Sequence, residues 1–304
     1  MKTYFAAGVQ PLFVLMWSSA FIAGIIGVGA APSMTVLFAR FGIAGVLLAA
    51  YSMLVRVKWP RGRELGHVIV AGLLLQIAQF GGFYSAMGQH VPGAVIALIQ
   101  GLSPVVIALF AGFLGESITP RQWFGFAIGG VGVALAVLDK TSFSLAGLLL
   151  CVTGLLGLSL GTIYQKRYVS GVDPKAATSV HLLVSAPVAG IIAWATGQLH
   201  VYDVVRFTGA IAWMVLLNSI AAFLLYFWML RRMDATRVSR LLFVTPATTA
   251  VAAWLIVGQP LRPLTIAGLA IGLAGMVFAS RKPSTEPSVE PVRQPGPAAV
   301  LAVR

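Results

Sequence analysis

The stretch GESITPRQWFGFAIGGVGVALA occupies residues 115–136, and a related stretch, GQPLRPLTIAGLAIGLAGMVFA, occupies residues 258–279. When Gly115 is aligned with Gly258, the two share eight identities in 22 positions, including the pattern G-x3-G-x2-G. An apolar composition alone does not produce so many matches in one register. Because similarity at a fixed offset marks a repeated structural unit, the chain is predicted to contain two copies of one unit.

The repeat continues toward the N-terminus of each copy with a shift of one position in the alignment. The aligned positions are Gln76 with Asn218, Tyr84 with Tyr226, Met87 with Met229, and Ser103-Pro104 with Thr245-Pro246. The first two pairs are polar within apolar runs, where an unpaired polar group costs about 1 to 3 kcal/mol. We expect these two pairs to face one central cavity from opposite halves; packing between helices is the alternative.

The composition is that of a membrane protein. Of 304 residues, 59% are hydrophobic and only 10% are charged, which lies outside the usual range of soluble proteins. Apolar runs of about 20 residues, the length that crosses a bilayer as a helix, recur along the chain. They lie near 8–27, 34–55, 66–87, 91–114, 121–138, 143–165, 177–196, 208–230, 237–257 and 264–280. The predicted fold is an all-α integral membrane protein with ten transmembrane helices.

The number of spans in each copy decides how the two copies are oriented relative to each other in the membrane. Five is odd, so the second copy enters the membrane upside down relative to the first. Residues 1–138 form the first predicted five-helix repeat and 139–282 the second, while 283–304 form a proline-rich tail predicted to be disordered. Two inverted repeats around a central cavity can open that cavity to each side in turn. A duplication that only builds a stable bundle is the alternative.

The basic residues gather on one side of this topology. With loops on alternate sides, seventeen Lys and Arg residues fall on one side and three, Lys140, Arg206 and Arg262, on the other. The positive-inside rule therefore predicts an inner-membrane protein with both termini in the cytoplasm. The same distribution accounts for the net charge of +13, so we expect no nucleic-acid partner. The single cysteine, Cys151, excludes an intrachain disulfide.

Several motifs resemble the drug/metabolite transporter superfamily, specifically its EamA-type members, from about residue 8 to residue 282. They are Trp17-Ser18-Ser19-Ala20-Phe21, Pro32 with Ala39-Arg40-Phe41, Ser103-Pro104 with Gly115-Glu116, and Gly161-Thr162-Ile163-Tyr164-Gln165-Lys166-Arg167. Two positions depart from the pattern of that family. Leu158 stands where many relatives have Trp, and Gln259 replaces the usual Glu of the second repeat.

The resemblance implies a ten-helix basket, in which four helices of each repeat surround the cavity and the fifth packs outside. Together with the inverted repeat it favours a secondary transporter, not driven by ATP, that exports small metabolites such as amino acids by alternating access. The expected partners are a small-molecule substrate and the lipid bilayer, and the expected assembly is a monomer or homodimer. No cofactor, metal or catalytic residue is expected.

Polar side chains at membrane depth must face protein or water, which selects the candidate cavity residues. The candidates are Trp17, Ser18, Gln76, Gln79, Tyr84, Gln100, Ser103, Ser159, Tyr164, Asn218 and Tyr226. Pro104 and Pro246 are expected to break their helices at matching places and to act as hinges.

Two ionisable residues inside spans leave alternatives open. Arg40 either binds a substrate carboxylate or donates hydrogen bonds to helix-end carbonyls. His181, near the equivalent point of the second repeat, either couples transport to protons or packs as a hydrogen-bonded histidine. No Asp or Glu lies in the interior of a predicted span.

The competing class is a non-transporting membrane protein, either an enzyme with lipid substrates or a subunit of a larger complex. The chain contains no G-x4-G-K-[ST] phosphate loop and no H-E-x-x-H zinc motif, so an enzyme is not expected. A sugar-phosphate or nucleotide-sugar exchanger is a further alternative. Such an exchanger would need paired basic residues at the cavity, and only Arg40 is available.

Overall fold

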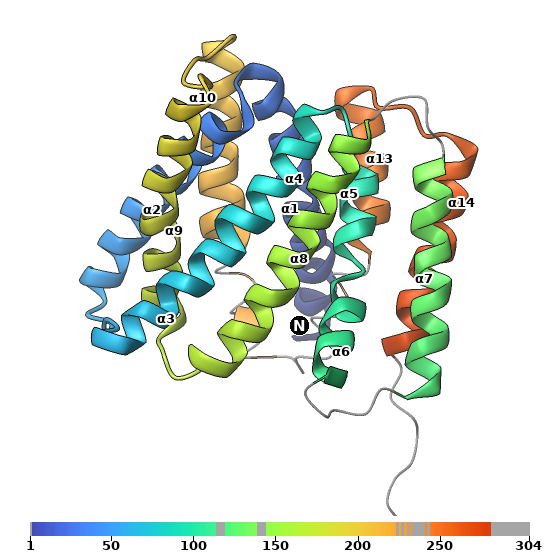
Figure 1. Ribbon diagram of the computed structural model, residues 1–304, viewed down its shortest axis with the longest axis horizontal. Coiled ribbons are helices and arrows are strands. Elements are labelled where there is room, and N and C mark those ends of the chain that lie inside the picture. The colour runs from blue at the N-terminus through green and yellow to red at the C-terminus, as the bar shows by residue number, and fades with distance from the viewer. Residues whose placement is uncertain are drawn as a thin grey trace, which may run out of the picture.

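The computed structural model of the protein describes residues 2–113, 119–138, 144–222, 225, 228–229, 232, 241 and 244–280 (Figure 1). This part of the chain is helical and contains no β-strand. Tyr226, the motif residues Gly115 and Glu116, and the predicted tail at 283–304 lie outside the described residues. The protein is an all-α integral membrane protein, as the composition predicts.

The first copy contains seven α-helices in the described residues. They are α1 (Lys2–Ala30), α2 (Ser33–Leu54), α3 (Gly62–Gly72), α4 (Gln79–Gly88), α5 (Gly93–Gln100), α6 (Ser103–Phe113) and α7 (Pro120–Leu138). The π-helical segment η1 (Leu73–Ala78) joins α3 to α4, so these three elements form one continuous rod.

The described part of the second copy follows the same order. Its helices are α8 (Leu145–Tyr168), α9 (Pro174–Ala195), α10 (Val204–Trp213), α13 (Thr245–Val257) and α14 (Pro263–Ser280). A second π-helical segment, η2 (Met214–Ala222), continues α10.

The predicted spans correspond to these helices with small shifts at their ends. Among the described residues, eight helical stretches are long and apolar enough to cross a membrane. The ninth and tenth predicted spans correspond to α13 and α14, which are shorter apolar helices in the described chain. Eight of the ten spans therefore have the full length of a crossing.

The connections between helices define two ends of the molecule. Segments 31–32, 89–92, 196–203 and 258–262 lie at the upper end in Figure 1, and segments 55–61 and 169–173 lie at the lower end. It follows that α2 runs from the upper to the lower end, whereas α9, its counterpart, runs from the lower to the upper end. The second copy is therefore inverted relative to the first.

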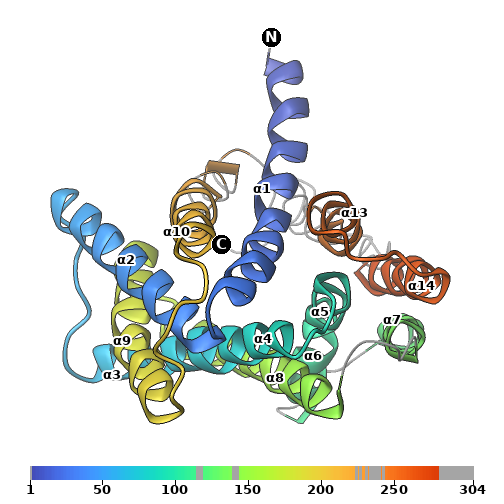
Figure 2. The same ribbon diagram turned by 90° about the horizontal axis from the view of Figure 1, so that it is seen from above.

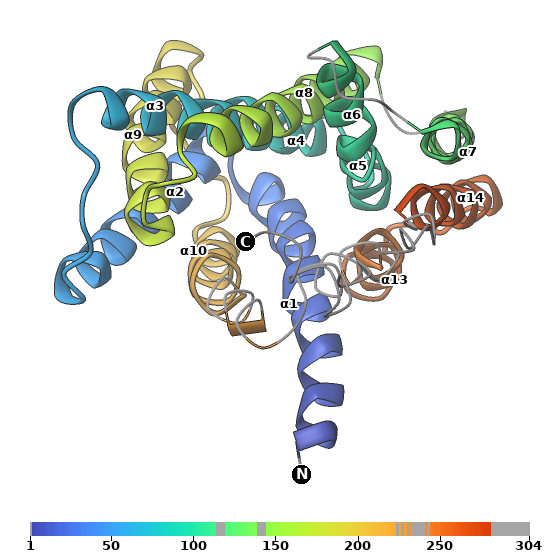
Figure 3. The same cartoon turned by 90° about the horizontal axis from the view of Figure 1, so that it is seen from below.

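The first helix of each copy packs on the other copy. Figures 2 and 3 show α1 between α10 and α13, and α8 across the rod of α3, η1 and α4. The contacts agree, because α1 packs mainly on α13, α10 and η2, while α8 packs mainly on η1, α3, α4 and α6. Each half of the bundle is thus built from helices of both repeats.

The fifth helices, α7 and α14, form a pair at one edge of the molecule (Figure 2). A Cβ atom added at Gly132 would clash with the backbone nitrogen of Gly272, and one added at Gly275 would lie 2.5 Å from that of Gly129. The alignment of Gly115 with Gly258 also aligns Gly129 with Gly272 and Gly132 with Gly275. Exchanging the two copies therefore turns the contact of Gly132 with Gly272 into the contact of Gly275 with Gly129. Such reciprocal contacts are those of a two-fold arrangement.

The second helices, α2 and α9, repeat this reciprocity at the opposite edge. A Cβ atom added at Gly45 would lie 3.2 Å from the backbone nitrogen of Leu183, and one at Gly42 would lie 4.0 Å from Ala186 Cβ. Aligning Gly42 with Leu183 also aligns Gly45 with Ala186, and this exchanges the two contacts. The two copies therefore pack against each other through two helix pairs. Nearly the same alignment of the copies relates the contacts in both pairs.

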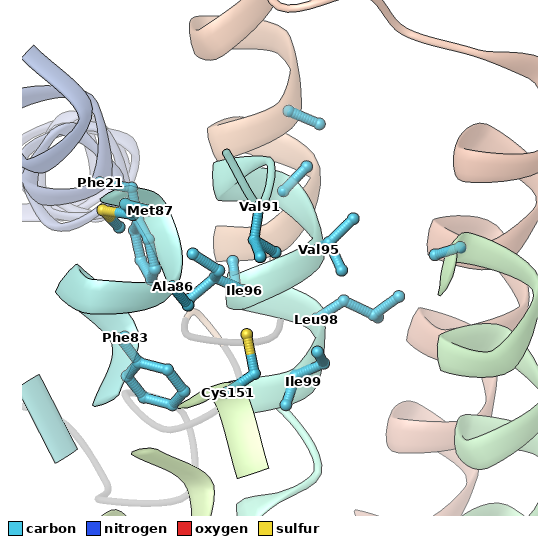
Figure 4. Close-up of a cluster of buried hydrophobic side chains, with 14 of the residues drawn as sticks. Phe21, Phe83, Ala86, Met87, Val91, Val95, Ile96, Leu98, Ile99 and Cys151 are labelled. Atoms are coloured by element: carbon cyan, nitrogen blue, oxygen red, sulfur yellow. The ribbon is translucent and has the colours of Figure 1, made fainter. Parts of the chain in front are cut away.

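A buried apolar cluster fills the space between α5 and its neighbours (Figure 4). All residues from Gly93 to Ile99 are buried, because α5 has other helices on every side. Cys151 of α8 lies in this cluster and is fully buried. The cluster separates α7 and α14 from the polar side chains on the other side of α4.

Candidate functional site

A cavity of about 280 Å³ lies between the two copies, where α1, α2, η1, α4, α9 and η2 meet. Eight predicted site residues line it, namely Trp17, Arg40, Gln76, Gln79, Tyr84, Gln100, His181 and Asn218. The other lining residues were not among the predicted site residues; they are Ala20, Phe21, Leu75, Phe80, Phe83, Met87, Gln165, Thr178 and Ala222. The lining combines amides with aromatic rings and contains no carboxylate among the described residues.

Two other hollows are larger but have a different character. One of about 550 Å³ lies over α1 between α10 and α13 and is lined mostly by apolar side chains. The other, of about 350 Å³, lies at the upper end among the loops. The cavity between the copies is the functional candidate, because it gathers polar side chains from the membrane-spanning helices of both copies.

The aligned amides Gln76 and Asn218 both lie in π-helical segments. The alignment of these two residues maps η1, at 73–78, onto 215–220, which lies inside η2. A π-helical turn is wider than an α-helical turn and often occurs at functional sites. The two wide turns bring the matched amides to the same cavity from opposite copies.

Arg40 is the cation of the cavity. Its side chain is 6% exposed, and its Nη1 donates a hydrogen bond of 2.7 Å to the hydroxyl of Tyr84. The guanidinium lies over the ring of Phe80, 4.7 Å from the centroid. The Tyr84 hydroxyl in turn donates to Met214 Sδ at 3.1 Å. This chain of contacts connects α2 and α4 of the first copy with η2 of the second.

Asn218 fastens η2 to α1. Its Nδ2 donates to the carbonyl oxygen of Met16 at 2.6 Å and to the hydroxyl of Ser19 at 3.2 Å. Since a carbonyl oxygen only accepts, this contact fixes the orientation of the amide. The Oδ1 atom of Asn218 is left buried without a hydrogen-bond partner among the described residues.

His181 lies on α9 against the rod of α3, η1 and α4. A Cβ atom added at Gly72 would lie 2.8 Å from the Cα of His181, so the two backbones are in close contact. The imidazole is 3% exposed, and its Nε2 has no hydrogen-bond partner among the described residues. A role in proton coupling stays a prediction.

Toward the upper end, α1 packs tightly against residues of both copies. A Cβ atom at Gly27 would lie 3.2 Å from Val36, 3.4 Å from Met214 and 3.6 Å from the Cβ of Ala210. We call Gly27, Val36, Ala210 and Met214 the upper seal. Toward the lower end the cavity extends to Gln165 and Thr178. Each of these is about one turn from the lower end of its helix.

Four other predicted cavity residues lie elsewhere. Ser18 faces the hollow between α10 and α13. Ser103 and Ser159 are buried but do not line the cavity. The Tyr164 hydroxyl forms a 2.8 Å hydrogen bond with Nδ1 of His67. A polar side chain within an apolar run therefore predicts a position away from lipid. It does not show whether that position lines the cavity or lies between two packed helices.

The two predicted hinge prolines begin helices. Ser103-Pro104 starts α6 after a turn at 101–102, and Thr245-Pro246 starts α13. Proline is tolerated in the first turn of a helix because its missing N–H group has no partner there. Neither proline lines the cavity.

One pattern associated with hydrolases is present at 157–161, where GLSLG fits G-x-S-x-G. That motif requires its serine on a turn between a strand and a helix. Ser159 instead lies inside α8 and is fully buried. The flanking glycines serve helix packing, since a Cβ atom at Gly157 would lie 2.6 Å from the backbone nitrogen of Gln79.

The model of the EamA-like transporter family matches residues 11–138 and 145–281 of the chain. Over 272 residues the chain is 26% identical to the "Uncharacterized inner membrane transporter YedA" of Escherichia coli strain K12, covering 87% of this chain and 86% of that protein. Over 294 residues it is 25% identical to a "Probable terminal-alkyne amino-acid exporter" of Streptantibioticus cattleyicolor, covering 93% and 95%.

The fold has a counterpart among solved structures. One crystal structure superposes with a TM-score of 0.63 at 19% sequence identity, covering 89% of this chain and 94% of that one. At this level of identity the likeness concerns the arrangement of the helices alone.

Proposed function

This chain belongs to the EamA-like transporter family, and on that premise we propose that it is a secondary carrier that exports small metabolites, such as amino acids, by alternating access. The family and the named relatives establish the coarser statement, which is a multi-pass membrane transporter with a small-molecule substrate. The direction, the substrate class and the mechanism are the proposal.

The cavity between two inverted copies is the observation that carries the proposal. Its walls come from both repeats, and the upper seal also joins residues of both. Because the copies are related by exchange, a second conformation with the copies interchanged would close the lower end and open the upper end. That exchange is alternating access.

The charges at the lower end support the proposed direction of export. Arg56, Lys58, Arg61 and Arg63 lie in the connection between α2 and α3 or at the start of α3, which is at the lower end (Figure 1). Under the positive-inside rule this end faces the cytoplasm. A cavity that extends toward the cytoplasm and is sealed on the other side supports uptake of a cytoplasmic solute for export.

Purified protein in liposomes tests the proposal. Vesicles loaded with labelled amino acids should release them faster than vesicles without protein. Exchange restricted to phosphorylated sugars or nucleotide sugars would favour the exchanger hypothesis. No movement of any solute in a broad panel, together with a stoichiometric bound partner, would instead assign the chain to the non-transporting class.

A further inference from the structure

Arg40 carries a positive charge that nothing in the described structure neutralises. Its one hydrogen-bond acceptor there is the neutral Tyr84 hydroxyl, and its remaining contacts are the faces of the Phe80 and Tyr84 rings. Its Nε has no partner among the described residues. Such a buried cation is costly in a membrane protein unless an anion joins it.

The sequence offers no interior carboxylate for this purpose. Its acidic residues are Glu64, Glu116, Asp139, Asp173, Asp203, Asp234, Glu286 and Glu290, and none lies in the interior of a predicted span. In the described chain, Asp173 and Asp203 cap α9 and α10 and pair with Lys175 and Arg206. Among the described residues no carboxylate is therefore available to Arg40 as a counter-ion, and an anionic group of the substrate can take that place.

The structural role expected for Arg40 from the sequence is not seen in its contacts, which instead join α2 to α4. Such a role would have the guanidinium donate to backbone carbonyls at a helix end. Among the described residues, the hydrogen bonds run from Arg40 to Tyr84 and on to Met214, with no carbonyl acceptor for Arg40. The guanidinium instead lines the cavity.

Neutral acceptors line the same cavity. The Oδ1 of Asn218 lacks a partner among the described residues, and the orientation of that amide is fixed by Met16. Gln76, the aligned amide of the first copy, also lines the cavity. Amide oxygens accept hydrogen bonds from an ammonium group without requiring a carboxylate in the site. The cavity thus offers a cation for an anionic group and dipoles for a cationic group.

Aromatic rings form another part of the lining, beside further polar side chains such as Gln79 and Gln100. Phe80 and Phe83 of α4 face the cavity together with Trp17 and Phe21 of α1. Rings of this kind favour contact with an apolar or aromatic side chain.

We infer that Arg40 binds the carboxylate of a zwitterionic substrate, that the amides of Asn218 and Gln76 accept hydrogen bonds from its ammonium group, and that its apolar side chain lies against the aromatic rings. This inference rests on the proposed carrier function and adds the substrate class and the residue that selects it. A guanidinium holds a carboxylate through two parallel hydrogen bonds, which a neutral carboxamide cannot match.

Binding to purified full-length protein in detergent tests the inference, with L-phenylalanine and L-phenylalaninamide as probes. The two share the ammonium group and the ring and differ at the carboxylate. The wild-type protein should bind L-phenylalanine about 10- to 100-fold more tightly than the amide. Arg40→Gln should abolish that preference. Arg206→Gln, the same change at an exposed arginine outside this cavity, should retain it.

Three outcomes would overturn the inference. They are equal binding of the two probes by the wild-type protein, binding of neither probe, and an unchanged preference in folded Arg40→Gln. The wild-type comparison holds even if Arg40→Gln does not fold. Liposome transport separates the two proposals: movement of solutes that lack a carboxylate would preserve the carrier and refute the role of Arg40, whereas absence of all transport would refute the carrier.

Discussion

The two amides that the repeat aligns, Gln76 and Asn218, differ in their hydrogen bonds. Asn218 donates hydrogen bonds to Met16 and Ser19 of α1. Gln76 has no side-chain hydrogen bond among the described residues and is partly exposed to the cavity. One alignment therefore yields Asn218, whose Nδ2 joins two helices while its Oδ1 has no partner among the described residues, and Gln76, whose whole amide has none.

Alanine at each position should separate these roles. We expect Gln76→Ala to weaken the apparent affinity for substrate about 2- to 10-fold, the effect of one neutral hydrogen bond, and to leave the melting temperature unchanged. Asn218→Ala should lower transport and also reduce stability by about 1 to 3 kcal/mol, because the two hydrogen bonds that join η2 to Met16 and Ser19 of α1 are lost. Transport kinetics in liposomes and thermal unfolding in detergent measure the two effects.

Equal loss of stability in both variants would show that Gln76 is also a joint between helices. Normal transport by Gln76→Ala would remove it from the substrate site.

Chemistry alone predicted several residues that line the cavity, and the repeat gave a second reason for Gln76, Asn218 and Tyr84. Gln76, Asn218, Tyr84 and Arg40 are polar or charged in apolar runs, and the structure brings all four to one cavity. Ser159 met the same chemical criterion and lies in a helix seam. A small hydroxyl is easily accommodated between helices, so polarity at this size does not predict exposure to a cavity.

The pairing of α7 with α14 shows how glycines set the distance between helices in a membrane. Without a hydrophobic driving force between helices in lipid, close backbone approach supplies the packing energy. The matched pattern of small residues in 115–136 and 258–279 predicts this surface, and the structure places it where the two helices touch.

Two neighbouring glycines of α7 provide a matched test of that contact. Gly132→Ala should destabilise the protein by about 1 to 3 kcal/mol, because the new methyl group meets the backbone of Gly268 and Gly272, which cannot move cheaply. Gly130→Ala should cost nothing, since no atom lies within 4 Å of the new group. Thermal unfolding in detergent measures both.

The reciprocal variant Gly275→Ala should cost about as much as Gly132→Ala, because its contacts are the exchanged ones. Equal stability of Gly132→Ala and Gly130→Ala would mean that the close approach of α7 and α14 does not hold in the membrane protein.

The composition of the sequence predicts the helices. It predicts only some of the breaks and π-helical turns within them. Pro104 and Pro246 mark the starts of α6 and α13. Nothing in LLLQIA or MVLLNSIAA indicates a π-helical turn, because both segments have an ordinary apolar composition. Such turns depend on the packing of neighbouring helices, which a single sequence does not specify.

The orientation of the whole protein can be determined with two single cysteines in a Cys151→Ala background. His200 is exposed at the upper end and Ser170 at the lower end. A thiol reagent that cannot cross membranes should label His200→Cys in intact cells, and Ser170→Cys only after permeabilisation. The opposite pattern would refute the cytoplasmic assignment of the lower end.

Alternating access predicts that the upper seal must part during each transport cycle. The Cβ positions of Gly27 and Ala210 are 3.6 Å apart, within the range of a disulfide. We expect the double variant Gly27→Cys, Ala210→Cys, without Cys151, to lose transport on oxidation and to regain it on reduction. Each single variant under the same oxidant is the control, and transport by the oxidised pair would show that α1 and α10 need not separate.

The two π-helical turns carry information about the history of the chain. A π-helical turn arises when a helix accommodates one surplus residue, and here both copies accommodate it at positions that one alignment relates. Two independent insertions at the same place are a less simple account than one inheritance. On the account of a single inheritance, the surplus residue would have been present in an ancestor of half this length, before its gene was doubled. Such an ancestor would have had to insert in both orientations and pair with itself to enclose a cavity.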